Sequence, residues 1–178
     1  MSPSEIQPTS RGGDSGPSAV RRAGEGSSAA DSAAPGEGQV VTIREFRLED
    51  ERSVVALWQE CDLVRSWNDP GKDIARKGRV RPDLFLVGVL DGAIVATVMA
   101  GYDGHRGRIN YLAVTPTMRR QGHGRALMQD AERRLRDTGC PKINLQIRSA
   151  NAAVVAFYRA LGYAEDAVVS MGKRLEPD

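Results

Sequence analysis

The sequence predicts a mixed α/β domain, and two observations support that prediction. Segments with the two-residue alternation of strands and segments with the 3.6-residue periodicity of helices follow one another from about residue 39 onward. Their order is strand, helices, three strands, helix, strand, helix, strand. The sequence contains no internal repeat, so the pattern favours one domain in which helices pack on a central sheet.

The composition sets the class of protein. A chain of 178 residues with 40% hydrophobic content can bury a sizeable core. A net charge of +2 and a pI near 8.7 indicate no strong attraction to nucleic acid or to a membrane surface, but they allow an anionic small ligand. The sequence has no apolar run near the roughly 20 residues of a membrane span. It also lacks the hydrophobic centre of a secretory signal, so we expect a cytoplasmic protein.

The first 38 residues differ from the rest of the chain. Gly, Pro, Ser and Ala dominate residues 1–38, which contain no aromatic residue. Such a segment cannot bury enough apolar surface to offset the entropy lost on ordering. We therefore expect a disordered tail at 1–38 and a folded domain at 39–178. The alternative is a docking or targeting arm whose only charge cluster is Arg21–Arg22.

The expected elements follow from periodicity and from turn residues. Asp50 and Glu51 suit the first turn of a helix, Asp91–Gly92 is a hairpin signal, and Gly139 and Gly162 suit helix ends. Helices are expected at residues 48–62, at 73–77, from near 122 to 139, and at 151–161. Strands are expected at residues 41–46, 84–90, 93–102, 108–114, 142–148 and 168–175.

The stretch LAVTPTMRRQGHGRAL, residues 112–127, joins a strand to a helix through Gly122 and Gly124. The first amides of a helix have no partner within it and carry a partial positive charge, which attracts phosphates. Glycine permits close approach to the backbone. Three arginines add full positive charges near the same glycines: Arg119, Arg120 and Arg125. The pattern therefore indicates a diphosphate cradle.

The two glycines alone do not decide between ligand binding and a simple turn. Leu127 occupies the third glycine position of a dinucleotide fingerprint, and no Gly-Lys-Ser/Thr follows as in a P-loop. A tight turn with solvated arginines explains the same residues.

A second segment, NAAVVAFYRALGY at residues 151–163, narrows the choice. Together with LAV (112–114) and RRQGHG (119–124), it resembles the motifs of the GNAT superfamily, the GCN5-related N-acetyltransferases. The resemblance covers residues 41–175. The segments CDLVRSWNDPGKDIARK, GYDGHRG, GCPKINL and VVSMGKRL are similar to those of the YpeA-type bacterial acetyltransferases.

This resemblance implies the GNAT fold: a mostly antiparallel sheet of six to seven strands with about four helices, splayed between the fourth and fifth strands. It implies acetyl-CoA as the donor, direct transfer to an amine, and no metal. The pantetheine arm would fill the splay and pair with the backbone of residues 112–114 like an added strand. The Leu112 amide would hold the thioester carbonyl, and the Asn151 side chain would contact the arm. The residues implied for binding coenzyme A are Leu112, Ala113, Val114, Arg119, Arg120, Gln121, Gly122, His123, Gly124, Arg125 and Asn151.

The resemblance also implies that Tyr158 delivers a proton to the departing thiolate. A phenol with a pKa near 10 is a workable donor to a thiolate. The alternative is that Tyr158 is a core residue. A core role is the favoured interpretation of the adjacent Phe157. We expect His123 to be exposed and not catalytic.

No side-chain base is evident. Relatives carry a glutamate near the end of the fourth strand, where this chain has Ile109-Asn110-Tyr111. One hypothesis is a water chain that ends on Asp103 or His105, since a histidine titrates near neutrality. Alternatively, His105 is a solvated loop residue.

Residues 67–70 lie where related enzymes place the helices that contact the acceptor substrate. Trp67 and Asp69 could line an acceptor pocket, and Asp69 and Asp73 would suit a cationic amine. A capped turn with a packed ring explains the same residues. The acceptor could be a small amine or a protein amino group.

Other interpretations concern the activity, nucleic-acid binding, the cysteines and the oligomeric state. The missing carboxylate allows a coenzyme A-binding regulatory or interaction module without turnover. Nucleic-acid binding through Arg133, Arg134 and Arg136 is disfavoured because Glu132 and Asp137 are interleaved with them. Free thiols are favoured at Cys61 and Cys140 over a disulfide. The sequence does not give the oligomeric state, and a dimer is possible.

Overall fold

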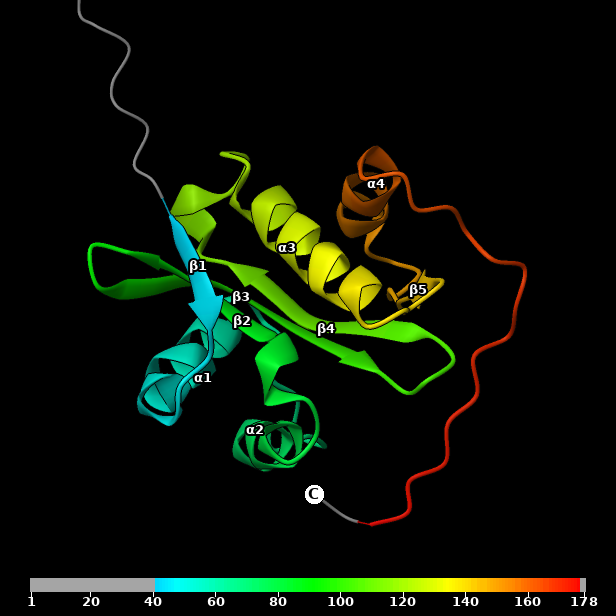
Figure 1. The fold of residues 1–178 in the computed structure, drawn as a ribbon, viewed down its shortest axis with the longest axis horizontal. Coiled ribbons are helices and arrows are strands. Elements are labelled where there is room, and N and C mark those ends of the chain that lie inside the picture. Colours follow the sequence, from blue (N-terminus) through cyan, green and yellow to red (C-terminus); the bar gives the residue numbers. More distant parts are fainter. Residues whose placement is uncertain (1–40, 177–178) are drawn as a thin grey trace, which may run out of the picture. The chain divides into compact units, whose positions relative to one another are not determined.

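The structure is a computed structural model that describes residues 41–176. The tail expected at residues 1–38 lies outside this range. Four α-helices and five strands are present in the described part, with three short 3₁₀ helices between them (Figure 1). In chain order they are β1 (Thr42–Glu45), η1 (Leu48–Asp50), α1 (Glu51–Glu60), α2 (Pro70–Gly78), η2 (Pro82–Leu84), β2 (Phe85–Leu90), β3 (Ala93–Tyr102), β4 (Gly107–Val114), η3 (Pro116–Met118), α3 (His123–Asp137), β5 (Ile143–Asn144) and α4 (Ala152–Ala160).

The five strands form one sheet in the order β1-β2-β3-β4-β5. The first four strands pair antiparallel with their sequence neighbours. Helix α3 then carries the chain back, so that β5 pairs parallel with β4. The mixed, mostly antiparallel α/β architecture predicted from the sequence is therefore confirmed.

Helices cover both faces of the sheet. Alternating residues of the 84–87 segment divide between two cores: Leu84 and Leu86 pack with α3, whereas Phe85 and Val87 pack with α1 and α2. Figure 1 shows α3 and α4 on one side of the sheet and α1 and α2 on the other. Because strands of this sheet are buried on both faces, their sequences are nearly continuous apolar runs.

Strand β4 carries a bulge that reverses its alternation. Ile109 and Leu112 both pack on the α3 side, whereas Tyr111 and Ala113 pack on the side of α1 and α2. The register of β4 with β3 shifts between Thr97 and Met99, and Tyr111 has a φ of +49°. One extra residue in a strand produces this change of phase.

The sheet opens between β4 and β5, as the resemblance implied. Only two residue pairs join them, Gly107 with Ile143 and Arg108 with Asn144. The rest of β4, up to Val114, has no strand beside it on that edge within residues 41–176.

The expected count of six to seven strands is wrong for the described residues, which contain five strands. The predicted strand at 168–175 forms no ladder, and Val168, Val169 and Met171 are exposed. Side-chain hydrogen bonds, and not backbone pairs, join residues 166–170 to residues 142–146. Lys142 donates to Asp166, and Gln146 donates to Ser170. The predicted strand at 142–148 shortens to Ile143–Asn144 for the same reason. A strand needs a backbone partner, and the sheet diverges there.

The turn signals are confirmed. Asp91 and Gly92 have φ values of +49° and +80° between β2 and β3, which is the geometry of a tight hairpin. Gly139 and Gly162 have positive φ just after α3 and α4.

Candidate functional site

Helix α3 begins where the sequence places the cradle. Gly122 is its N-cap, with a φ of +89°. The first hydrogen bond within the helix runs from the Ala126 amide to the Gly122 carbonyl at 3.0 Å. The amides of His123, Gly124 and Arg125 therefore have no partner inside the helix and carry its positive end.

The two glycines serve different purposes. Gly122 has a backbone conformation that side chains rarely adopt, and a Cβ there would meet open space. At Gly124, a Cβ would lie 3.4 Å from the Phe157 ring and 3.6 Å from Val114. Gly122 thus shapes the turn and leaves its approach open, whereas Gly124 lets α4 pack closely on α3.

The three arginines differ in their contacts. Arg119 donates from Nε to the Val114 carbonyl at 3.1 Å, and Arg125 donates to the Ala160 carbonyl at the end of α4 at 3.2 Å. Arg120 is exposed and has a φ of +64°. Gln121 is exposed and donates to the Thr117 carbonyl at 3.3 Å.

His123 differs from the sequence-based expectation. It is half-buried rather than exposed, and its Nε2 atom is buried without a hydrogen-bond partner in the structure. Buried ring nitrogens normally have a partner, so His123 Nε2 is an exception to that rule.

The end of β4 presents Leu112, Ala113 and Val114. Ala113 is buried against α1 and α2, whereas Leu112 and Val114 are half-buried on the α3 side. The Val114 carbonyl accepts from Arg119 and from the Cys61 thiol, whose Sγ lies 3.4 Å away. Cys61 and Cys140 are both free thiols.

Tyr158 lies in α4 and is 7% exposed. Its ring packs edge-on against Phe157 and Tyr163, with centroids 5.1 and 5.4 Å apart. Burial raises the pKa of Tyr158 to about 12. Asn151 caps α4, with Oδ1 accepting from the Val154 amide at 3.3 Å.

A hydrogen-bonded chain holds the bulge of β4. The Trp58 indole donates to Thr97 Oγ1 at 2.9 Å, and the Thr97 hydroxyl donates to the Tyr111 carbonyl at 2.9 Å. The rings of Trp58 and Tyr111 stack with centroids 3.9 Å apart. The positive φ of Tyr111 is thus fixed by buried contacts.

A polar cluster that the sequence did not reveal surrounds the Tyr111 hydroxyl. This hydroxyl donates to Asp73 Oδ2 at 2.6 Å, and Asn68 Nδ2 donates to the Tyr111 oxygen at 2.7 Å and to Asp73 Oδ2 at 2.5 Å. Arg76 lies 3.1 Å from Asp73 Oδ1. We call Asn68, Asp73 and Tyr111 the Asp73–Tyr111 cluster. In the sequence, Asp73 is notable only as a carboxylate that would suit a cationic amine, and Tyr111 only as part of a stretch without a carboxylate.

Trp67 and Asp69, both expected on the acceptor side, differ in their surroundings. Asp69 caps α2, accepting from the amides of Gly71 and Lys72 at 2.8 and 3.2 Å, which fits the capped turn. The Trp67 ring is 58% exposed, so it is not the packed ring of that alternative.

Asp103 and His105 lie in the β3–β4 hairpin, at the opposite end of β4 from Val114. Asp103 accepts from the amides of His105 and Arg106. Since β4 spans Gly107–Val114, this hairpin lies about 20 Å from the cradle.

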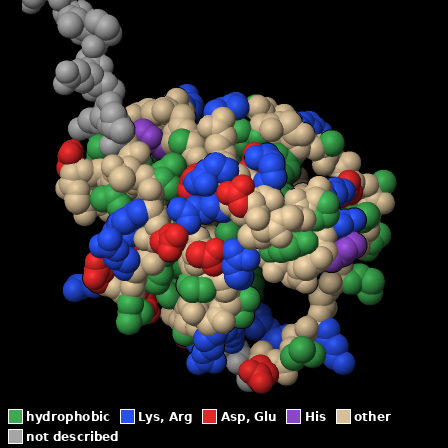
Figure 2. All heavy atoms as spheres, in the orientation of Figure 1, with side chains coloured by type: hydrophobic (Ala, Val, Ile, Leu, Met, Phe, Trp, Pro, Cys, Tyr) green, Lys and Arg blue, Asp and Glu red, His purple; other side chains and the backbone are tan. Residues whose placement is uncertain are grey.

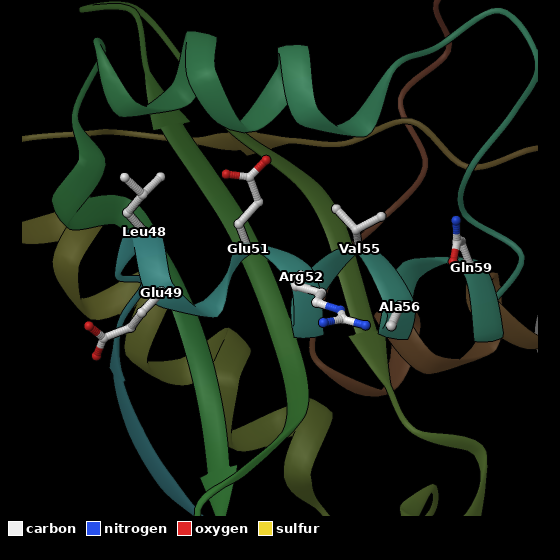
Figure 3. A pocket seen from close by; sticks show the side chains of 7 residues that line it. All are labelled: Leu48, Glu49, Glu51, Arg52, Val55, Ala56 and Gln59. Atoms are coloured by element: carbon white, nitrogen blue, oxygen red, sulfur yellow. The ribbon is translucent and has the colours of Figure 1, made fainter.

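Two other surface features lie apart from the cradle. An open hollow of about 590 Å³ is lined by residues of η1 and α1, including Leu48, Arg52 and Gln59 (Figure 3). Figure 2 shows basic and acidic side chains interspersed on the face seen there.

Within residues 41–176, no group of three or more His, Cys, Asp and Glu side chains could hold a metal ion. No helix in that range is long and apolar enough to cross a membrane.

Comparisons with known proteins agree with this geometry. The model of the acetyltransferase (GNAT) family matches residues 45–163. The chain is 49% identical over 137 residues to acetyltransferase SG1711 of Sodalis glossinidius (strain morsitans), covering 76% of this chain and 96% of that protein. It is similar in structure to Ard1 from Thermoplasma volcanium, with 25% identity and a TM-score of 0.62 over 71% of this chain and 84% of that one. The PaiA N-acetyltransferase from Thermoplasma acidophilum, solved with coenzyme A, has a TM-score of 0.65 over 73% of this chain and 93% of that one. Its 16% identity shows a shared fold alone.

Proposed function

The chain belongs to the acetyltransferase (GNAT) family and is an acyltransferase, and we propose that acetyl-CoA binds at the start of α3. The observation that carries this proposal is the set of helix amides at His123, Gly124 and Arg125 without intrahelical partners, placed beside the splay between β4 and β5. Phosphate oxygens are suited to such a helix terminus.

The donor would lie along β4 and end at the cradle. The backbone of Leu112 and Val114 faces the open edge, where a pantetheine amide chain can pair with it. The Leu112 amide would hold the thioester carbonyl, and a preorganised donor of this kind stabilises a developing oxyanion. Arg119 would exchange its bond with the Val114 carbonyl for a phosphate, and Arg120 and Asn151 would add contacts.

Tyr158 is the residue that we propose as the proton donor to the thiolate. The support is indirect: its ring packs against Phe157, and the Phe157 ring lies beside Gly124 at the start of α3. The pKa near 12 keeps the hydroxyl protonated throughout the neutral range, so that it stays a donor. A thiolate that receives this proton leaves as the neutral thiol.

The relatives favour the acetyltransferase function over a module without turnover. They are named as acetyltransferases, and the match to this chain covers nearly the whole length of each one. The acceptor is an amine, either a small molecule or a protein amino group.

The test is direct. Purified protein is incubated with acetyl-CoA and a panel of small amines, lysine peptides and peptides with free N-termini. Thiol release and product mass are both measured. We expect a mass increase of one acetyl group on at least one amine, in proportion to thiol release. Tight binding of coenzyme A with no product from any amine would favour the module, and no binding would contradict the donor site.

A further inference from the structure

We propose that the Asp73–Tyr111 cluster receives the proton of the attacking amine, with Tyr111 as the catalytic residue that contacts it. This inference rests on the proposed function, because it concerns the acceptor half of the same reaction. It assigns a base to a site where the expected strand carboxylate is missing. The carboxylate comes instead from α2, 38 residues away along the chain.

The location of Tyr111 is the first support. It occupies the bulge of β4, directly before Leu112, whose amide we place on the thioester carbonyl. The bulge turns the Tyr111 side chain toward α1 and α2, while Leu112 packs on the α3 side. The phenol therefore lies at the level of the acetyl group but on the opposite face of the sheet from the start of α3.

The backbone of Tyr111 is the second support. A non-glycine residue at a φ of +49° in a strand is strained and persists only where surrounding contacts hold it. Thr97 and Trp58 supply those contacts through the carbonyl and the ring. Such strain is concentrated at functional sites, and here its effect is to aim one hydroxyl group.

The hydrogen-bond directions are the third support. The Tyr111 hydroxyl donates to Asp73 Oδ2 at 2.6 Å, so its own proton already points at a carboxylate. The same oxygen accepts from the amide N–H of Asn68 at 2.7 Å, which is the kind of bond an amine N–H makes. Asn68 and Arg76 hold both oxygens of Asp73 in place.

The neutral amine attacks the thioester carbonyl, a C–N bond forms, and the nitrogen acquires a positive charge. An N–H proton passes to the Tyr111 oxygen as the Tyr111 proton passes to the Asp73 carboxylate. The C–S bond then breaks and the thiolate takes a proton from Tyr158. Asp73 releases its proton to solvent, and Tyr158 regains one from solvent, so both groups return to their starting states. Asp73 acts through Tyr111 and is a positioning residue.

The experiment compares Tyr111→Phe, Asp73→Asn and the double variant with wild type, using the best amine of the panel. Phenylalanine keeps the ring that stacks on Trp58. The matched control is Tyr102→Phe, which removes a hydroxyl bonded to the Gly104 carbonyl at the far end of β4. Circular dichroism and calorimetry with coenzyme A verify folding and donor binding in each variant.

We expect each single variant to lower kcat/KM for the amine at least tenfold at about pH 7, with unchanged affinity for coenzyme A. The double variant should be no worse than the poorer single variant, because a relay fails as a unit. The deficit of Tyr111→Phe should shrink as the pH approaches about 10, where the amine is neutral and hydroxide can accept the proton.

Wild-type kcat/KM and an unchanged pH profile in Tyr111→Phe would overturn the relay. A deficit in the double variant equal to the product of the single deficits would also overturn it. If wild type binds no coenzyme A or acetylates no amine, the proposed function itself fails and the relay falls with it. The calorimetric result therefore separates the two failures.

Discussion

The indole ring of Trp58 lies flat on the phenol ring of Tyr111, and Thr97 joins the two residues through one hydroxyl group. That hydroxyl accepts from the Trp58 indole and donates to the Tyr111 carbonyl. Thr97 is fully buried. A single side chain in β3 thereby connects α1 to the bulge of β4.

Replacing Thr97 with valine should destabilise the protein by about 2 kcal/mol, because the isosteric change leaves a buried N–H and a buried carbonyl without their partner. Urea unfolding followed by circular dichroism measures the difference. Thr115→Val, which removes a surface bond to Glu60, should change the free energy of unfolding by less than about 0.5 kcal/mol. Equal effects of the two substitutions would contradict the role of Thr97.

Gly122→Val should weaken coenzyme A binding at least tenfold in titration calorimetry. A β-branched side chain resists the φ of +89° and occupies the open approach to the amides of α3. Gly92→Val is the matched control: Gly92 also has positive φ and open space around it, but it lies in the β2–β3 hairpin. Both variants should lose stability, and only Gly122→Val should lose affinity. Retained affinity in Gly122→Val would remove the cradle from the donor site.

Tyr158→Phe should lower kcat by about 10²–10⁴-fold, with little change in the KM for acetyl-CoA. Phenylalanine preserves the packing against Phe157 and Tyr163, so the loss reports the hydroxyl group. Tyr163→Phe, which removes a bond to Glu132, serves as the neighbouring control. Since the pKa of Tyr158 is about 12, wild-type kcat should show no downward limb from this group below about pH 10. Full activity in Tyr158→Phe would leave Tyr158 as a core residue.

Lys77 should make stability depend on pH. Its ammonium is buried in α2 and donates to the Ala100 carbonyl at 2.5 Å, and burial lowers its pKa from 10.5 to about 8. The unfolded chain binds more protons between these two values, so the free energy of unfolding rises with pH across that window.

Relative to Lys77→Met, wild type should gain about 3 kcal/mol between about pH 7 and pH 10.5. Denaturant unfolding at the two pH values gives this difference, and methionine removes the titrating group while filling its space. Lys72→Met, on the exposed side of the same helix, should show no such window. A parallel pH dependence in wild type and Lys77→Met would contradict the depressed pKa.

Local signals in the sequence predicted most of the fold. The Asp91–Gly92 turn placed the β2–β3 hairpin, and Gly139 and Gly162 placed the ends of α3 and α4, because each depends on backbone conformation at one residue. The start of α3 at Gly122 was predicted for the same reason. The error at residues 168–175 has a physical origin: an apolar run shows that a strand could form, but its ladder depends on whether β5 stays beside β4.

The Asp73–Tyr111 cluster could not be predicted in the same way. The charge of Asp73 suggested that it would suit a cationic amine, but nothing in the sequence indicates that it pairs with Tyr111. The bulge is also hidden, because the apolar run after Asn110 fits either face of the sheet. Only the packing of α2 against β4 brings the carboxylate to the hydroxyl.

The extra residue in β4 has an evolutionary consequence. Tyr111 and Ala113 pack with α1 and α2, whereas Leu112 and Val114 pack with α3. If acetyl-CoA binds at α3 as proposed, substitutions in α1 and α2 would alter the choice of nucleophile and leave the acyl-donor site intact. Deleting a single residue from this strand would end that independence, because it would turn the Tyr111 ring into the opposite core.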